Sequence, residues 1–147
     1  MTDQELQKFT SELNQIIPII FREMFRRQTY LAKGKISPPQ LLILDLLDKE
    51  GPCKMSDLAK LMSVSGPAIT GLIDRLEKTK LVVRIFDVKD RRIIQINITP
   101  QGKRLLEKIS QERQKLINEV FSKLTQKERN QYLAILKKVQ TILLKNV

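Results

Sequence analysis

The chain has 147 residues, 41% hydrophobic and 29% charged, which is the composition of one globular domain and excludes a disordered basic tail. Lysine and arginine number 27 against 16 acidic residues, and this net charge of +11 favours polyanions, such as nucleic acid or an anionic membrane surface. The single cysteine, Cys53, excludes an internal disulfide, and in a chain without histidine we expect no metal site and no cofactor.

The first predicted element is an amphipathic helix within residues 1–35. Its apolar residues recur every three or four positions from Leu6 to Met24, and Pro18 should kink it. A shorter helix follows, with Ser37 as its cap and Gly51-Pro52 at its end. There is no signal-peptide pattern and no run of eighteen apolar residues, so we expect no membrane partner and a cytoplasmic location.

Two short helical patterns between residues 53 and 79 have the spacing of a helix-turn-helix. A small residue, Ala59, stands where the helices must touch, and Ser65 can cap the second helix. Presented this way, the second helix fits the major groove of DNA with its N-terminal turns nearest the bases. The candidate DNA-binding residues of this recognition helix are Ser65, Gly66, Pro67, Thr70, Gly71 and Arg75.

Two β-type runs, residues 81–86 and 93–98, predict a hairpin directly after the recognition helix. The second run alternates isoleucine with Gln95 and Asn97, the period of a strand with one buried face. A basic hairpin tip here is typical of a winged helix, whose wing reaches the adjacent minor groove. We expect Asp90 to brace the guanidinium of Arg92. The candidate wing residues are Lys89, Asp90, Arg91 and Arg92; the alternative is an ordinary turn with solvated arginines.

Two further helices are predicted after the hairpin. Thr99 and Pro100 provide the start of the first, and Thr125 with Glu128 forms a capping box for the second. The basic excess is largest here, and these lysines either flank phosphates or keep the surface hydrated. The apolar stripes at both chain ends are too large to stay exposed, which predicts a homodimer. Two-fold symmetry would favour a palindromic site.

The segment from Gly51 to Gly102 resembles the multiple antibiotic resistance regulator (MarR) family. The most specific match is the signature D-x-R-x-x-x-x-x-[LI]-T, formed here by Asp90, Arg92, Ile98 and Thr99. The resemblance implies a mainly α fold with a small β-hairpin wing, a winged helix-turn-helix with N- and C-terminal dimerisation helices. Residues 1–147 would form a single MarR-like domain, with a DNA-binding lobe at 36–99 and dimerisation helices at 1–35 and 100–147.

Several positions depart from the family pattern. Gly66 and Gly71 stand where arginine is frequent, so direct base reading is reduced and shape readout by Arg92 gains weight. Ser63 stands where the turn commonly has glycine. Lys80 replaces the glycine usual after the recognition helix, which predicts a different C-cap or a residue at positive φ.

The resemblance also implies a small-molecule effector, an aromatic or other anion that releases the protein from DNA. The candidate effector-binding residues are Arg22, Arg26 and Tyr30, which share one side of the first helix near its end; as alternatives they are surface side chains or dimer contacts. Cys53 lacks an obvious activating partner, which favours an inert thiol over a peroxide sensor.

These observations predict a homodimeric regulator, a repressor, that binds promoter double-stranded DNA specifically and is not an enzyme. The sequence has no phosphate-cradling glycine loop and no convergent carboxylate pair. The alternative is a non-specific or architectural DNA-binding protein, which would bind random and promoter DNA with similar affinity.

Overall fold

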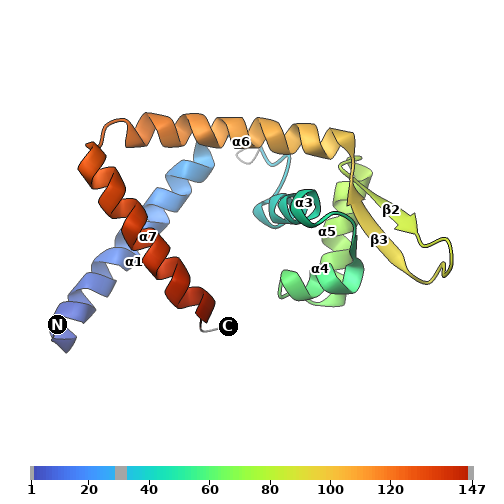
Figure 1. The fold of residues 1–147 in the computed structure, drawn as a ribbon, viewed down its shortest axis with the longest axis horizontal. Helices are drawn as coiled ribbons and strands as arrows, with labels where there is room; N and C mark the ends of the chain where they lie inside the picture. Colours follow the sequence, from blue (N-terminus) through green and yellow to red (C-terminus); the bar gives the residue numbers. More distant parts are fainter. Residues whose placement is uncertain (1, 29–32, 146–147) are drawn as a thin grey trace. The chain divides into compact units, whose positions relative to one another are not determined.

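The computed structural model describes residues 2–28 and 33–145, which form mainly helices and one small sheet (Figure 1). Two compact units are present, Met1–Glu112 and Arg113–Val147. The helices are α1 (Asp3–Arg26), α3 (Pro38–Glu50), α4 (Met55–Leu61), α5 (Gly66–Lys78), α6 (Pro100–Phe121) and α7 (Gln126–Lys145), and the strands are β1 (Cys53–Lys54), β2 (Val82–Phe86) and β3 (Ile94–Ile98). This order confirms the predicted fold class.

Helix α1 begins at a capping box. The Thr2 hydroxyl accepts a hydrogen bond from the Glu5 amide at 3.3 Å, and the Glu5 carboxylate accepts one from the Thr2 amide at 2.8 Å. The helix continues through Pro18 to Arg26. Its large apolar side chains are exposed in the single chain, at 43–72% of their surface: Leu6, Phe9, Ile16, Ile17, Ile19, Ile20 and Phe21.

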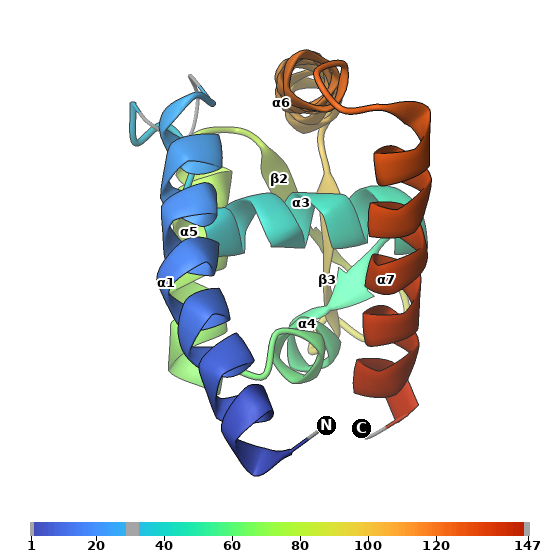
Figure 2. The ribbon, with the colours of Figure 1, turned by 90° about the vertical axis from the view of Figure 1, so that its left-hand side faces the viewer.

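The core of the first unit lies between α3, α4, α5 and the sheet. Figure 2 shows α3 crossing in front of β3 and α5. Helix α6 adds two side chains to this core, Leu106 and Ile109. Burial of each such side chain contributes about 1.5–3 kcal/mol, so one shared core fixes the helices and the sheet together. The side chains with at most 1% exposure are Ile43, Leu44, Leu47, Leu58, Ile69, Ile73, Leu76, Ile96 and Ile109.

The sheet is antiparallel with the strand order β1-β3-β2. Cys53 pairs with Ile96, and Val82 pairs with Ile98. Val82, Ile96 and Ile98 are buried, whereas Gln95 and Asn97 alternate with them, as the period of two predicts. Strands β2 and β3 form a hairpin that projects from the helices around it (Figure 1).

The second unit is built around the turn between α6 and α7. Thr125 and Glu128 form the predicted capping box, and the amide and hydroxyl of Thr125 lower the pKa of the Glu128 carboxyl. The Arg129 guanidinium donates to the carbonyl oxygens of Phe121 and Leu124 at 3.1 and 2.7 Å, which satisfies one acceptor at the end of α6 and one in the turn that follows it. Within the described ranges, no helix is both long and apolar enough to span a bilayer.

Candidate nucleic-acid interface

Helices α4 and α5 form the predicted helix-turn-helix. The turn between them is closed by the Val64 amide, which donates to the Ala59 carbonyl at 3.0 Å. Ser63 takes a left-handed conformation in this turn, with φ of 53°. Ala59 is half-buried and packs against the core, in agreement with the need for a small residue where the helices meet.

The N-terminal end of α5 is open to a partner. Ser65 caps the helix as predicted, because its hydroxyl accepts a hydrogen bond from the Ala68 amide at 3.3 Å. The Thr70 hydroxyl donates to the Gly66 carbonyl at 2.9 Å. A Cβ atom added at Gly66 or Gly71 would meet nothing within 4 Å. The helix backbone and its positive dipole end are therefore accessible at close range.

All the candidate residues of the recognition helix are exposed, including Pro67 and Arg75. They lie opposite the buried face of α5, which Ile69, Ile73 and Leu76 form. The first charged side chain along the exposed face is that of Asp74. Sequence reading by the first two turns therefore depends on hydroxyl, methylene and backbone groups, and not on a cation.

The wing tip is held by two successive aspartate turns. The Asp87 carboxylate accepts hydrogen bonds from the amides of Lys89 and Asp90 at 2.8 and 3.1 Å. These two bonds, first that from Asp90, lower the pKa of the Asp87 carboxyl. The Ile93 amide donates to the Asp90 carbonyl at 2.9 Å and closes the second turn. The backbone of the tip is thus ordered while Lys89, Arg91 and Arg92 stay exposed.

The expected role of Asp90 is wrong. Its carboxylate accepts a hydrogen bond from the backbone amide of Arg92 at 2.9 Å, and in the described part of the chain no partner for the Arg92 guanidinium is found. A spacing of two residues suits an aspartate turn, in which the short carboxylate reaches the amide and the long arginine extends outward. Asp90 therefore directs Arg92 through the backbone.

Sequence reasoning missed Arg84, which joins the wing to the recognition helix. From β2 its guanidinium forms ion pairs with Asp74 and Glu77 of α5. The hydrogen bond to Asp74 is the main cause that raises the Arg84 pKa. The available signal was position: Arg84 lies two residues after Val82 and therefore on the same inner face of the strand, where a charged side chain needs a partner.

The segment after α5 contains a non-glycine residue at positive φ, one of the two outcomes predicted there. Lys80 has φ of 59°, the left-handed conformation usual for glycine at this place. The Lys80 amide donates to the Glu77 carbonyl at 2.8 Å and the Leu81 amide to the Leu76 carbonyl at 2.9 Å, so the last turn of α5 is closed despite the lysine.

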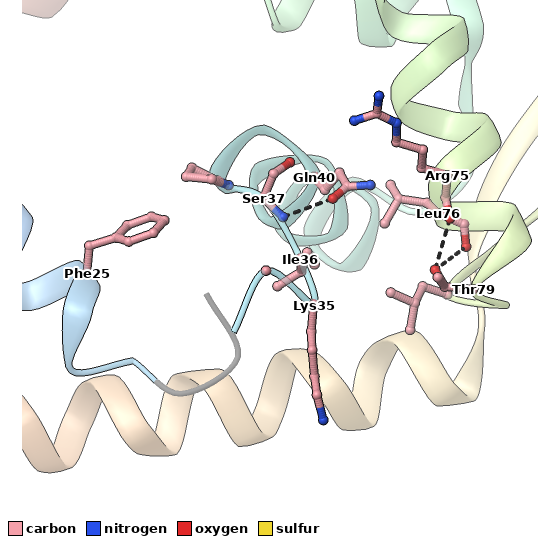
Figure 3. A pocket seen from close by; sticks show the side chains of 11 residues that line it. Phe25, Lys35, Ile36, Ser37, Gln40, Arg75, Leu76 and Thr79 are labelled. Carbon is pink, nitrogen blue, oxygen red and sulfur yellow. Dashed lines mark hydrogen bonds between the residues drawn. The ribbon is translucent and has the colours of Figure 1, made fainter. Parts of the chain in front are cut away.

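A cavity of about 420 Å³ lies between the end of α1, the start of α3 and α5 (Figure 3). We call it the α3 cavity. Phe25 lines it from α1, Arg75 lines it from α5, and Thr79 lines it from the C-cap of α5. The remaining lining residues are Gly34, Lys35, Ile36, Ser37, Pro38, Gln40, Leu76 and Leu81.

A second and more open hollow, the α1 hollow, is lined by Phe21, Arg22, Phe25 and Arg26. It thus contains two of the predicted effector residues, although the Arg26 guanidinium pairs with the Glu23 carboxylate at 2.8 Å. Tyr30, the third, lies outside the described residues.

Comparison with known proteins agrees with this geometry. The model of the MarR family matches residues 36–94. The HTH-type transcriptional repressor MdtR of Bacillus subtilis is 35% identical over 98 residues, 67% of this chain and 63% of that protein. The crystal structure of YusO from Bacillus subtilis is 30% identical, covers 96% of this chain and 98% of its own, and superposes with a TM-score of 0.78.

A structure of a mutant S. aureus MepR bound to an oligodeoxyribonucleotide is also similar. It is 26% identical, covers 88% of this chain and 96% of its own, and has a TM-score of 0.66. The matched family and MdtR are transcriptional regulators and not enzymes. This chain, with its helix-turn-helix and basic wing, belongs to the MarR family of transcriptional regulators.

Proposed function

We propose that this protein is a repressor that binds a palindromic operator as a homodimer, with α5 in the major groove and the wing in the adjacent minor groove. The observation that carries the proposal is the pairing of an open helix N-terminus with an ordered basic hairpin on one core. A preordered tip loses less conformational entropy when it binds, so Arg92 is suited to a narrow minor groove.

The test compares two DNA sequences and two arginines. Genomic fragments bound by the protein are selected, and affinity is measured by fluorescence anisotropy at one salt concentration for the selected site and for random DNA. We expect a preference of at least about a thousandfold for the site. Arg92→Ala should weaken operator binding at least about tenfold, whereas Arg104→Ala, the same charge change on an exposed residue of α6, should cost about twofold or less.

Equal affinity for random DNA and for the selected site would show that the protein is an architectural DNA-binding protein and not a specific repressor. A footprint that shows no protected bases would overturn DNA recognition altogether. If Arg92→Ala binds as tightly as the wild type while the site is still selected, the helix is supported and the wing contact is wrong.

The homodimer is supported by apolar side chains that the single chain leaves exposed on α1 and on α7. On α7 these are Tyr132, Leu133, Ile135, Leu136, Val139, Ile142, Leu143 and Leu144. Faces of this size normally mark an interface between proteins. Ile20→Glu, which places a charge on the apolar face of α1, should shift the protein to the monomer in sedimentation, whereas Gln15→Glu should not. A wild-type monomer at micromolar concentration would contradict the dimer.

We further propose that a small aromatic anion enters the α3 cavity and weakens DNA binding. Phe25, Ile36 and Leu76 offer an apolar wall, and Arg75 supplies positive charge. The Lys35 stem lines the cavity, while its ammonium points away from the other labelled side chains (Figure 3). Because Arg75 belongs to α5, a ligand here would act directly on the recognition helix. The two hollows are distinguished by variants, since Lys35 lines only the α3 cavity and Arg22 only the α1 hollow.

Isothermal titration with a panel of phenolic acids tests this site. Lys35→Ala should weaken binding of an active compound, and Arg22→Ala should leave it unchanged. The reverse result would place the effector in the α1 hollow. No heat from any compound, together with no loss of DNA binding, would remove the effector proposal.

A further inference from the structure

The wing and the recognition helix are connected by side chains as well as by the chain itself. Asp74 and Glu77 are three residues apart on α5 and therefore share a face of the helix. Arg84 approaches this face from the third position of β2 and forms ion pairs with both carboxylates. One planar guanidinium holds enough N–H donors, in a fixed fork, to bind two acceptors at once. A lysine ammonium has no such fork.

We infer that Arg84 is a positioning residue for DNA binding: held between Asp74 and Glu77, it fixes the wing at the angle to α5 that lets both bind one duplex. This inference rests on the proposed function. We call the three side chains the Arg84 clamp.

Asp74 is unfavourably placed for a helix that binds DNA. Its side chain is 57% exposed and lies on the outer face of α5, where a free carboxylate would repel phosphate. The ion pair with Arg84 offsets this charge. Arg84 itself has a side chain that is only 23% exposed, and its guanidinium is already bound on two sides. It is therefore poorly placed to contact phosphate directly.

The clamp lies near the root of the wing, which is where an angular restraint has the largest effect. Arg84 pairs in register with Ile96, and the hairpin continues through Phe86 and Ile94 into the loop that carries Arg92. Each strand residue adds roughly 3.3 Å, so a small tilt at Arg84 displaces the tip by more than the root. Val82 and Ile96 are buried in the core, so the root of the wing should stay packed when the clamp is removed.

An ion pair that solvent reaches contributes little to overall stability. Its value here would lie in orientation, because two contacts on a rigid body bind together more tightly than two contacts that move independently. The clamp should therefore affect the contribution of Arg92 to binding, and affect the melting temperature little.

A double-mutant cycle on the selected operator tests this coupling. Arg84→Gln and Arg92→Ala are measured singly and together by fluorescence anisotropy over a range of salt concentrations. We expect Arg84→Gln to weaken binding about tenfold, and the double variant to bind only about twofold more weakly than Arg92→Ala alone. In the Arg92→Ala background, Arg84→Gln should change the slope of affinity against salt by clearly less than one, because the unpaired Asp74 carboxylate repels phosphate but no phosphate contact is lost.

Reversing the charges provides the rescue. Arg84→Glu should weaken binding, and adding Glu77→Arg should restore most of the affinity by rebuilding an ion pair between the same elements. Arg84→Lys keeps the charge without the fork and should bind with intermediate affinity. Circular dichroism melts of every variant show whether it folds, and Arg84→Lys keeps the test valid should Arg84→Gln unfold.

Fully additive losses in the cycle would overturn the inference. A salt slope that falls by about one when Arg84→Gln is added to the Arg92→Ala variant would also overturn it, by assigning Arg84 a direct phosphate contact. These outcomes leave the proposed function standing, because the wild type still selects its site. A wild type that shows no preference for any DNA would instead remove the proposed function.

Discussion

The hydroxyl of Thr99 donates a hydrogen bond to the carbonyl oxygen of Lys80 at 2.7 Å, across 19 residues of the chain. The same hydroxyl oxygen accepts from the Gly102 amide at 3.0 Å, and the Thr99 amide donates to the Leu81 carbonyl at 3.0 Å. One residue thus ties the end of α5 to the start of α6 and closes the root of the wing. The threonine of the family signature has a structural reason here.

Replacing Thr99 should open this root. Thr99→Val keeps the shape but removes the hydroxyl, leaving a helix amide and a carbonyl without their partner, so we expect the free energy of unfolding to fall by about 1–3 kcal/mol. Thr99→Ser keeps the hydroxyl and should cost less than about 1 kcal/mol. Urea denaturation measures both variants. Equal stability of Thr99→Val and the wild type would contradict the assignment.

Gly102, in the first turn of α6, lies close against Leu81 and Ile98. A Cβ atom here would lie 2.3 Å from the Leu81 carbonyl oxygen and 2.8 Å from Cγ1 of Ile98. Backbone cannot move aside cheaply, so Gly102→Ala should lower the free energy of unfolding by about 1–3 kcal/mol. The matched control is Gly71→Ala in α5, which has open space and should raise it by about 0.5–1 kcal/mol. Thermal or urea unfolding measures both variants. A free energy of unfolding that changed in the same direction for both would contradict the prediction.

Most of the fold could be predicted because it follows from local chemistry. Ser65, Thr99 and Thr125 mark helix starts by their capping hydroxyls, and the alternation around Ile96 gives the buried side of β3. These signals depend on neighbours within a few residues, which the sequence displays directly.

The electrostatic details of the site depend on packing between distant elements. The partners of Arg84 are 7 and 10 residues away and meet it only when β2 folds back along α5. The sequence places Asp74 on the outer face of the helix but does not show this partner. Asp90 shows a different limit. The sequence points correctly to Arg92 as its partner, but the Asp90 carboxylate bonds the backbone amide of Arg92 and not its guanidinium.

The aspartate turn at the wing tip should resist acid. Hydrogen bonds from the amides of Asp90 and Lys89 hold the Asp87 pKa below its ordinary value of 3.8. A lowered pKa means that the ionised carboxylate stabilises the turn at pH values above 3.8, and that this stabilisation is lost as pH falls through the lower pKa of the folded protein. The amide resonances of Lys89 and Asp90 should therefore shift with a midpoint below pH 3.8.

Two variants separate the oxygen acceptor from its charge. Asp87→Asn retains an acceptor and should keep the turn with no acid transition, whereas Asp87→Ala should lose amide protection at Lys89 and weaken operator binding. A midpoint at or above 3.8 in the wild type would show that the carboxylate does not hold the tip in solution.

Cys53 should behave as an unreactive thiol. Burial raises its pKa above the ordinary value of 9.0, and Glu50 and Asp57 raise it further by opposing a negative charge. The nucleophilic thiolate is therefore a small minority form at neutral pH, so at pH 7.5 iodoacetamide should alkylate the native protein several-fold more slowly than free cysteine. Unfolding in urea should restore the ordinary rate. Dilute hydrogen peroxide should leave operator affinity unchanged, and Cys53→Ser should bind as the wild type does. Rapid alkylation at neutral pH, or peroxide-dependent release of DNA that Cys53→Ser abolishes, would make this residue a redox sensor.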